Sequence, residues 1–395
     1  MSQKNILQIE RRLIMRHYRH LSDELINQLF YIKPQNFDKN SDINILKYAL
    51  GATLYIPAIK DNLLEMLIKT KYPALTTVVI CLEDAISVEQ TSIAIENLNN
   101  LFSKLHEAVI ENSNVLQELP LIFIRIREYS QLENLLENPD IRHIVCGFVL
   151  PKYEAVVGIK CLSLIDNVNK NFKCNLYALP LIESRQVINI DTRLYELKKI
   201  KESIDMYKHL ILNIRIGGTD FSGIFGLRRS IDFSIYDIIV VSGCISDIIN
   251  TFNISENDYI ISGAVWEYFS SIGDTQNIID CIKNNAAYLE NPKSSTKAVD
   301  GLLKELHLDK ANGLVGKTII HPSQITFVNA MQAVTFEEYA DAKNILSCSV
   351  GGAIKSDYNN KMNEVSPHLR WAKKIMQRTA VYGVLNPNES NTNLF

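Results

Sequence analysis

The sequence lacks several features that mark particular classes of protein. Its seven cysteines are scattered, and none forms the close pairs of metal or redox sites, so we expect free thiols and a reducing, cytoplasmic compartment. No apolar run reaches the roughly 18 residues of a membrane span, and the N-terminal segment has no continuous apolar core, so neither a membrane anchor nor a secretory signal is expected. A net charge of -3 argues against a nucleic-acid or membrane-surface binder.

The stretch Gly316-Lys317-Thr318 lacks what a nucleotide-phosphate loop requires. Such a loop has a glycine five residues before the Gly-Lys pair, where this chain has Ala311, and it opens a helix. Here the β-rich stretch TIIHP follows instead. We therefore predict that Gly-Lys starts the last strand and that His321 lies at the C-terminal end of this strand.

What the sequence does have is an alternation of β-rich apolar runs with helical patterns, typical of a parallel sheet. Of the 395 residues, 47% are hydrophobic and 22% are charged, so the chain can bury a large core. Eight runs predict an α/β fold in which the sheet closes into a (β/α)8 TIM barrel. The runs are TLYIPAI (from Thr53), TTVVICLED (Thr76), LPLIFIRIR (Leu119), IVCGFVLPK (Ile144), LYALPLIES (Leu176), LILNIRIGGTD (Leu210), YIISGAVWEYF (Tyr259) and KTIIHP (Lys317).

Segments outside the runs complete the predicted organisation. We expect an N-terminal helical extension (residues 1–50), the barrel (51–330) and a C-terminal helical extension (331–395) with a mobile polar tail. Tyr236 to Asn250 is expected to be a buried helix, because its length does not suit a strand between two better ones. An amphipathic N-terminal helix is expected to expose Arg11, Arg12, Arg16 and Arg19. A crossover helix is expected to bury Ala94, Leu98, Leu101, Phe102, Leu105 and Val109.

Active sites of such barrels form at the C-terminal ends of the strands, so the polar residues that close each run are the candidates. Glu183 and Asp220 close consecutive strands, and two neighbouring carboxylates suit Mg²⁺. The alternatives are a helix-capping acid for Glu183 and an N-cap after the Gly217-Gly218 turn for Asp220. In strand order the candidates are Glu83 and Asp84, Arg125 and Arg127, Lys152, Glu183, Asp220, Glu267, and His321.

Two basic positions carry further hypotheses. Strand alternation puts Arg125 and Arg127 on the same side, and Arg125 in the barrel mouth would clamp a carboxylate or stabilise an enolate oxygen. For Arg127 we favour a surface salt bridge. A desolvated Lys152 would be a Schiff-base nucleophile, although nearby carboxylates would keep its ammonium group charged.

The segment GLVGKTIIHPSQI (Gly313 to Ile325) resembles the G-F-x-G-K-x-x-I-H-P-x-Q-I stretch of the citrate lyase beta subunit and hydroxy-keto-acid aldolase superfamily. Further matches follow in order over about residues 50–330. VVICLEDAIS resembles the L-D-L-E-D-A-V motif, FIRIR the R-V-N strand, GFVLPK the L-P-K segment, LPLIES the I-E-T motif and IRIGGTDFSGIFG the G-x-x-D-L motif. LGATLYIPA and GAVWEYF most resemble a bacterial branch of TIM-barrel carbon-carbon bond lyases associated with tellurium-resistance-type operons.

The resemblance implies a metal-dependent carbon-carbon lyase or aldolase that acts on a small carboxylate through an enolate. Glu183 and Asp220 would bind Mg²⁺, or Mn²⁺ as the alternative ion, and Arg125 would act in catalysis and, with Gly218, in substrate binding. Glu83 and Asp84 would organise water and transfer protons. A homo-oligomer, a trimer or a hexamer, is expected, and coenzyme A stays open as a cofactor.

Some positions depart from the family pattern. Cys81 replaces the first aspartate of L-D-L-E-D-A-V, Arg127 replaces the asparagine of R-V-N, and Trp266-Glu267-Tyr268 stands where relatives usually have Ile-Asp. The last change puts a thioester or acyl-carrier substrate in doubt. Two alternative functions remain open at this point: a Schiff-base aldolase that uses Lys152, and a catalytically inactive barrel that serves as a binding or assembly component.

Overall fold

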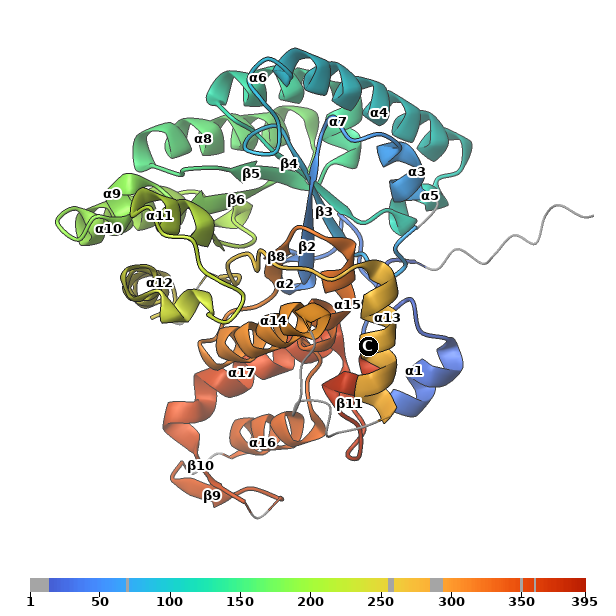
Figure 1. Ribbon diagram of the computed structural model, residues 1–395, viewed down its shortest axis with the longest axis vertical. Coiled ribbons are helices and arrows are strands. Elements are labelled where there is room, and N and C mark those ends of the chain that lie inside the picture. Colours follow the sequence, from blue (N-terminus) through green and yellow to red (C-terminus); the bar gives the residue numbers. More distant parts are fainter. Residues whose placement is uncertain (1–13, 69–70, 255–258, 285–293, 349–350, 359) are drawn as a thin grey trace, which may run out of the picture.

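The protein is described by a computed structural model that covers residues 14–68, 71–254, 259–284, 294–348, 351–358 and 360–395. Figure 1 shows a central set of strands with helices along its outer side and further helices beside one end. In the part of the chain so described, no helix is both long and apolar enough to cross a membrane.

The strands form a parallel barrel-like sheet with the order β7-β6-β5-β4-β3-β2-β8. Their inner and outer faces are both covered, which explains why runs such as TVVIC and LIFIR are mostly apolar and are buried along their whole length. These strands are β2 (Ala52–Pro57), β3 (Thr77–Cys81), β4 (Leu121–Arg125), β5 (Gly147–Leu150), β6 (Tyr177–Ile182), β7 (Arg215–Ile216) and β8 (Lys317–Ile319).

The predicted seventh strand differs from the others, because it reduces to isolated bridges between β7 and β8. Ile214 pairs with Ile261, and Gly263 pairs with Lys317, both in parallel. The backbone N–H of Ile214 donates to Ile260 O (2.8 Å), and the N–H of Val315 donates to Ile261 O (2.9 Å). Residues 259–263 therefore fill the gap between the sheet edges, and the predicted (β/α)8 fold class is confirmed with this one irregular position.

Helices follow the strands as the alternation predicts. The predicted crossover helix is α4, and the six apolar residues named for it are its buried residues. Most of the predicted helix from Tyr236 to Asn250 lies in α12 (Ile239–Phe252), which has one buried face, whereas Tyr236 belongs to the short 3-10 turn before it. The helices are α1 (Asp23–Leu29), α2 (Ile43–Ala49), α3 (Leu63–Ile68), α4 (Thr91–Glu111), α5 (Asn114–Glu118), α6 (Tyr129–Glu137), α7 (Pro139–Ile144), α8 (Ala155–Phe172), α9 (Arg185–Ile188), α10 (Arg193–Asp205), α11 (Gly218–Ile224), α12 (Ile239–Phe252), α13 (Ile272–Asn284), α14 (Ser294–Ala311), α15 (Ile325–Ala330), α16 (Phe336–Ser347) and α17 (Val365–Tyr382).

The segments before and after the barrel pack against each other. Strand β1 (Phe30–Ile32) pairs antiparallel with β11 (Val384–Leu385), and α17 packs on α2 and α16. A small hairpin of β9 (Ala353–Lys355) and β10 (Met362–Glu364) lies beyond α16 (Figure 1). The division into three segments at residues 50 and 330 stays a prediction.

Two expectations for the chain ends were wrong. Residues 14–22 form turns rather than an amphipathic helix. Arg19 is only partly exposed, because its guanidinium donates to the carbonyls of Pro73 (2.7 Å) and Glu118 (3.1 Å). Arg11 and Arg12 lie outside the described residues. The polar tail packs on the barrel: Leu394 and Phe395 are buried, and Asn391 donates to Ala330 O at 2.7 Å.

The structure explains the Gly-Lys-Thr stretch as the start of β8. Gly316 has a φ of +71°, and a Cβ there would lie 2.5 Å from Gly51 O, so only glycine fits this close approach. The Lys317 ammonium is fully buried and lies 2.8 Å from Glu305 and 2.8 Å from Asp309. Glu305 also pairs with Arg229, and Asp309 accepts from the hydroxyl of Tyr236 at 2.6 Å. The lysine is thus part of a buried ion network between β8 and α14.

We predict that Lys317→Met lowers the free energy of unfolding by about 3–5 kcal/mol, because it leaves buried acids without their cation. Urea unfolding measures the loss. The matched control is Lys297→Met, which removes an exposed pair with Asp232 (3.0 Å) and should change stability by less than about 0.5 kcal/mol. Equal effects of the two substitutions would contradict a stabilising role for the buried network.

Candidate active site

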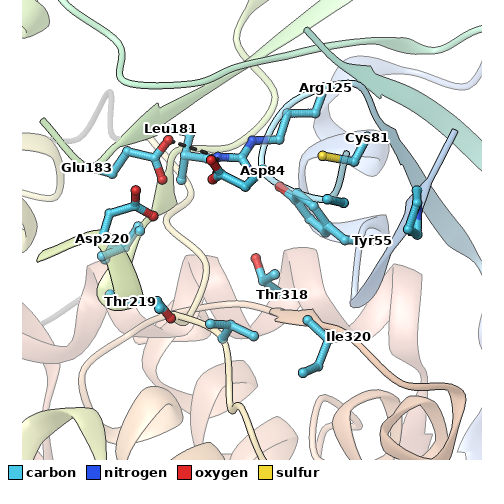
Figure 2. A pocket seen from close by; sticks show the side chains of 16 residues that line it. Tyr55, Cys81, Asp84, Arg125, Leu181, Glu183, Thr219, Asp220, Thr318 and Ile320 are labelled. Atoms are coloured by element: carbon cyan, nitrogen blue, oxygen red, sulfur yellow. Dashed lines mark hydrogen bonds and ion pairs between the residues drawn. The ribbon is translucent and has the colours of Figure 1, made fainter. Parts of the chain in front are cut away.

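A pocket of about 400 Å³ opens at the C-terminal ends of the barrel strands. In Figure 2, the side chains of Glu183 and Asp220 lie on one side of this space, and Tyr55 and Thr318 lie on the other. Arg125 and Asp84 lie along the edge between Glu183 and Tyr55 (Figure 2). The lining residues are Tyr55, Pro57, Cys81, Asp84, Ala85, Arg125, Leu181, Glu183, Ile216, Gly217, Gly218, Thr219, Asp220, Val265, Thr318 and Ile320. The pocket therefore lies where the barrel geometry places active sites.

Glu183 directly follows β6 and is 3% exposed. Its Oε1 accepts hydrogen bonds from Arg125 Nη2 (3.1 Å) and from the backbone N–H of Lys152 (3.1 Å). Among the described residues, Oε2 accepts no hydrogen bond. Burial raises the pKa of Glu183 to about 8, with a contribution from the neighbouring Asp220, although Arg125 acts in the opposite direction.

Asp220 lies in the first turn of α11 and faces Glu183 (Figure 2). Glycine at position 217 leaves the space that the Glu183 carboxylate occupies next to α11, because a Cβ on Gly217 would lie 2.3 Å from Glu183 Oε2. Gly218 also lines the pocket. Within the described part of the chain, the Asp220 carboxylate has neither a hydrogen bond nor an ion pair. The alternative role as a helix N-cap is wrong, since the N-cap residue is Gly217.

Arg125 ends β4 and joins the acids of the site through one nitrogen. Its Nη2 lies 2.6 Å from Glu83, 2.9 Å from Asp84 and 3.1 Å from Glu183. Burial lowers the pKa of Arg125, but the carboxylates of Glu183 and Glu83 outweigh it and raise the pKa above its ordinary value. Among the described residues, Nη1 makes no hydrogen bond, so this nitrogen is available to a ligand in the pocket.

Glu83 and Asp84 follow β3 but have different surroundings. Glu83 is buried, accepts from Lys152 Nζ at 2.6 Å, and its pKa is raised, mainly by burial. The Asp84 side chain is half exposed and lines the pocket. Burial raises the pKa of Asp84, but a hydrogen bond with Glu83 and the charges of Arg125 and Lys152 outweigh it, so this pKa is lowered.

The remaining candidates lie outside the pocket lining. The expected surface salt bridge of Arg127 was wrong: its guanidinium donates to the carbonyls of Glu83 (2.8 Å) and Ile86 (2.9 Å) and so fixes the acidic loop. Glu267 accepts from Arg229 (3.1 Å) and from Thr219 (3.0 Å). His321 stacks on Phe269, with ring centroids 4.3 Å apart, and caps a short helical turn.

Sequence reasoning missed the opposite wall of the pocket, which includes Tyr55 and Thr318. Tyr55 lies within the first strand and Thr318 within the last, whereas only residues at the strand ends were considered. The period-two alternation of TLYIP points Thr53, Tyr55 and Pro57 to one face, and this signal would have found Tyr55. For Thr318 no comparable signal exists in the short run KTIIHP.

Two carboxylates with an open oxygen between them fit Mg²⁺, which commonly takes one or two protein carboxylates and keeps several waters. Glu183 Oε2 and the Asp220 carboxylate supply such a pair. The described residues contain no group of three or more His, Cys, Asp or Glu side chains that could hold a metal. The residues present therefore suit a hard cation with an open coordination sphere rather than a closed structural site.

The model of the C-C bond lyase family of the TIM-barrel fold matches residues 44–384. The chain therefore belongs to this family of carbon-carbon bond lyases, which supports the superfamily expected from the motifs. The link to tellurium-resistance-type operons stays a prediction.

Two solved structures are similar to the chain, and the first of them, with a TM-score above 0.5, shares its fold. The CitE protein of Mycobacterium tuberculosis, in a complex with magnesium, acetoacetate and coenzyme A, is 20% identical with a TM-score of 0.51, over 84% of this chain and 98% of that chain. The citrate lyase beta subunit of the same organism, complexed with oxaloacetate and magnesium, is 17% identical with a TM-score of 0.45, over 72% of this chain and 96% of that chain. No curated protein sequence matches the chain.

The raised pKa of Glu183 predicts how the stability of the metal-free protein depends on pH. Between the ordinary value of 4.5 and about 8, the folded protein holds a proton that the unfolded chain has lost. The contribution of this group to the free energy of unfolding therefore falls as pH rises through this window, by up to about 1.4 kcal/mol per pH unit. Urea unfolding in EDTA at several pH values measures the slope.

The neutral and nearly isosteric variant Glu183→Gln removes this titration. We expect the difference in stability between variant and wild type to grow in favour of the variant from pH 5 to pH 8. Parallel pH profiles of the two proteins would show that Glu183 titrates normally.

Proposed function

We propose that the protein is a Mg²⁺-dependent lyase that cleaves or forms a carbon-carbon bond beside a carboxylate group of a small acid, through an enolate. The main support is that Oε2 of Glu183 accepts no hydrogen bond from the described residues and lies beside Asp220, in a pocket that Arg125 also lines. Glu183 and Asp220 would hold Mg²⁺. When bound, this ion supplies positive charge that offsets the negative charge developing on the substrate oxygen.

The residues around this pair suit the remaining tasks of such a reaction. Nη1 of Arg125 would donate to the substrate carboxylate or to the enolate oxygen, while Nη2 stays on the acids. Asp84 lines the pocket and Glu83 does not, so we assign proton transfer with the substrate to Asp84. Glu83 would position Arg125 and Lys152 by its two ion pairs. Gly218 would form part of the substrate surface.

The neighbouring CitE structure supports the choice of metal and ligand class, because its complex contains magnesium and acetoacetate. It also contains coenzyme A, so a free acid and an acyl thioester both belong in a substrate screen. Trp266, which departs from the family pattern, does not help to decide between a free acid and an acyl thioester, because it does not line the pocket. Its ring is buried, and its Nε1–H donates to Ala298 O at 2.8 Å.

The surroundings of Lys152 favour the metal-dependent function over a Schiff-base aldolase. Burial lowers the pKa of Lys152, but the hydrogen bond and charge of Glu83 outweigh it and raise the pKa. A protonated amine is not a nucleophile. Borohydride treatment with pyruvate is therefore expected to leave no reduced adduct on Lys152, and mass spectrometry of the treated protein measures this.

Calorimetric titration of oxalate, pyruvate and oxaloacetate tests the proposal. Oxalate mimics an enolate and is expected to bind the Mg²⁺-loaded protein but not the protein in EDTA. Asp220→Ala should lower this affinity at least about tenfold, because it removes one of two carboxylate ligands.

Glu267→Gln serves as the control, since Glu267 is also an acid at the barrel rim but lies outside the pocket lining. It should bind oxalate as the wild type does. Binding of oxalate without Mg²⁺, or an unchanged affinity in Asp220→Ala, would overturn the metal assignment. If no ligand bound under any condition, the catalytically inactive barrel would become the better explanation.

A further inference from the structure

Arg215 is a buried cation that the proposed reaction does not use. It comes from the short strand β7 and is 0% exposed. Its side chain reaches across the barrel interior to residues of β2 and β8. Among the described residues it has no ion pair with a carboxylate. Its guanidinium donates instead to two threonine hydroxyls, Thr53 Oγ1 (3.1 Å) and Thr318 Oγ1 (2.5 Å). By contrast, the buried basic groups of Arg125, Arg229 and Lys317 each contact at least two acids.

Burial of a cation without a counter-charge is costly, and the structure shows this cost in two ways. Burial lowers the pKa of Arg215, and only Tyr55 acts in the opposite direction. In addition, Arg215 Nε is buried without a hydrogen-bond partner among the described residues. An anion near this guanidinium would supply the counter-charge that the described residues do not provide.

Two hydroxyl groups connect Arg215 to the pocket. Thr318 Oγ1 accepts from Arg215, and Tyr55 lies beside the same guanidinium, with its ring centroid 6.0 Å from the guanidinium carbon. Both residues line the pocket. In the described part of the chain, no group accepts a hydrogen bond from either hydroxyl. A hydroxyl that accepts from a cation is polarised, and its own hydrogen is free to donate.

The positions of these hydroxyls define a second binding point in the pocket. Figure 2 shows Tyr55 and Thr318 across the open space from Glu183 and Asp220. Thr318 and Thr53 are register partners on β8 and β2, but only Thr318 lines the pocket. The opposite wall of the pocket thus offers two O–H donors that lie next to one buried positive charge. This arrangement favours binding of an anionic oxygen.

We propose that Tyr55, Thr318 and Arg215 form a subsite for a second carboxylate, so that the substrate is a dicarboxylic keto or hydroxy acid. This inference rests on the proposed function, in which Glu183 and Asp220 define the other end of the substrate. Tyr55 and Thr318 would contact the distal carboxylate, and Arg215 is a positioning residue that acts through them.

Pyruvate and oxaloacetate differ by one carboxylate and so probe the subsite, while oxalate reaches only the end at Glu183 and Asp220. Fresh solutions of each are titrated into the full chain with Mg²⁺. We expect oxaloacetate to bind at least about tenfold more tightly than pyruvate, which is the contribution of about one charge-assisted hydrogen bond. Thr318→Val and Tyr55→Phe should each reduce this preference, and Arg215→Met should abolish it, while the affinities for pyruvate and oxalate stay unchanged.

Thr53→Val is the matched control. It removes a hydroxyl that Arg215 also uses but that does not line the pocket, so the preference for oxaloacetate should persist. If Arg215→Met does not fold, the comparison of Thr318→Val with Thr53→Val decides. Equal preferences in these two variants, or no preference in the wild type, would overturn the subsite while Mg²⁺-dependent oxalate binding left the proposed function standing. Failure of oxalate to bind would overturn both.

Discussion

The ion pairs of Arg125 hold the candidate active site together. Its Nη2 nitrogen contacts carboxylates that follow β3 and β6, two strands that are not neighbours in the sheet. Without that cation, three carboxylates in the pocket lining and the neighbouring carboxylate of Glu83 would lie close together, and their mutual repulsion would favour protonation or separation. The arrangement instead leaves Glu183 and Asp220 close together with one oxygen of Glu183 open. A divalent cation bound by Glu183 and Asp220 would neutralise the negative charge that Arg125 leaves unpaired.

Buried charge is handled differently in three parts of the molecule. Lys317 is neutralised by Glu305 and Asp309 and serves the packing of α14 on the barrel. Arg125 is neutralised by acids that also line or border the pocket. Arg215 has hydroxyl partners alone, and its counter-charge is missing from the described chain. The contrast separates a structural network from groups whose electrostatic balance depends on what the pocket contains.

Much of the site was predictable because barrel geometry places the ends of the strands at one rim. Glu183 and Asp220 were found by their positions after consecutive apolar runs, and the structure places them face to face. Arg127 was misjudged because its partners are backbone carbonyls of the β3 loop, 44 and 41 residues away in sequence. The polar tail was misjudged because its composition suggests mobility, whereas Leu394 and Phe395 find a buried surface on the barrel.

By itself, the sequence determined the parallel α/β architecture, the apolar faces of the helices and the acidic strand ends, because periodicity and strand order are local properties of the chain. The fold alone decided which charges meet. Arg125 contacts three acids because β3, β4 and β6 end at the same rim. Lys317 is internal because α14 packs its acids against β8. Arg215 meets Thr318 because the sheet closes between β7 and β8. Closure brings Arg215 of β7 to Thr53 of β2 and Thr318 of β8, at the opposite end of the sheet order. No local pattern encodes the direction or partner of a long side chain inside the barrel.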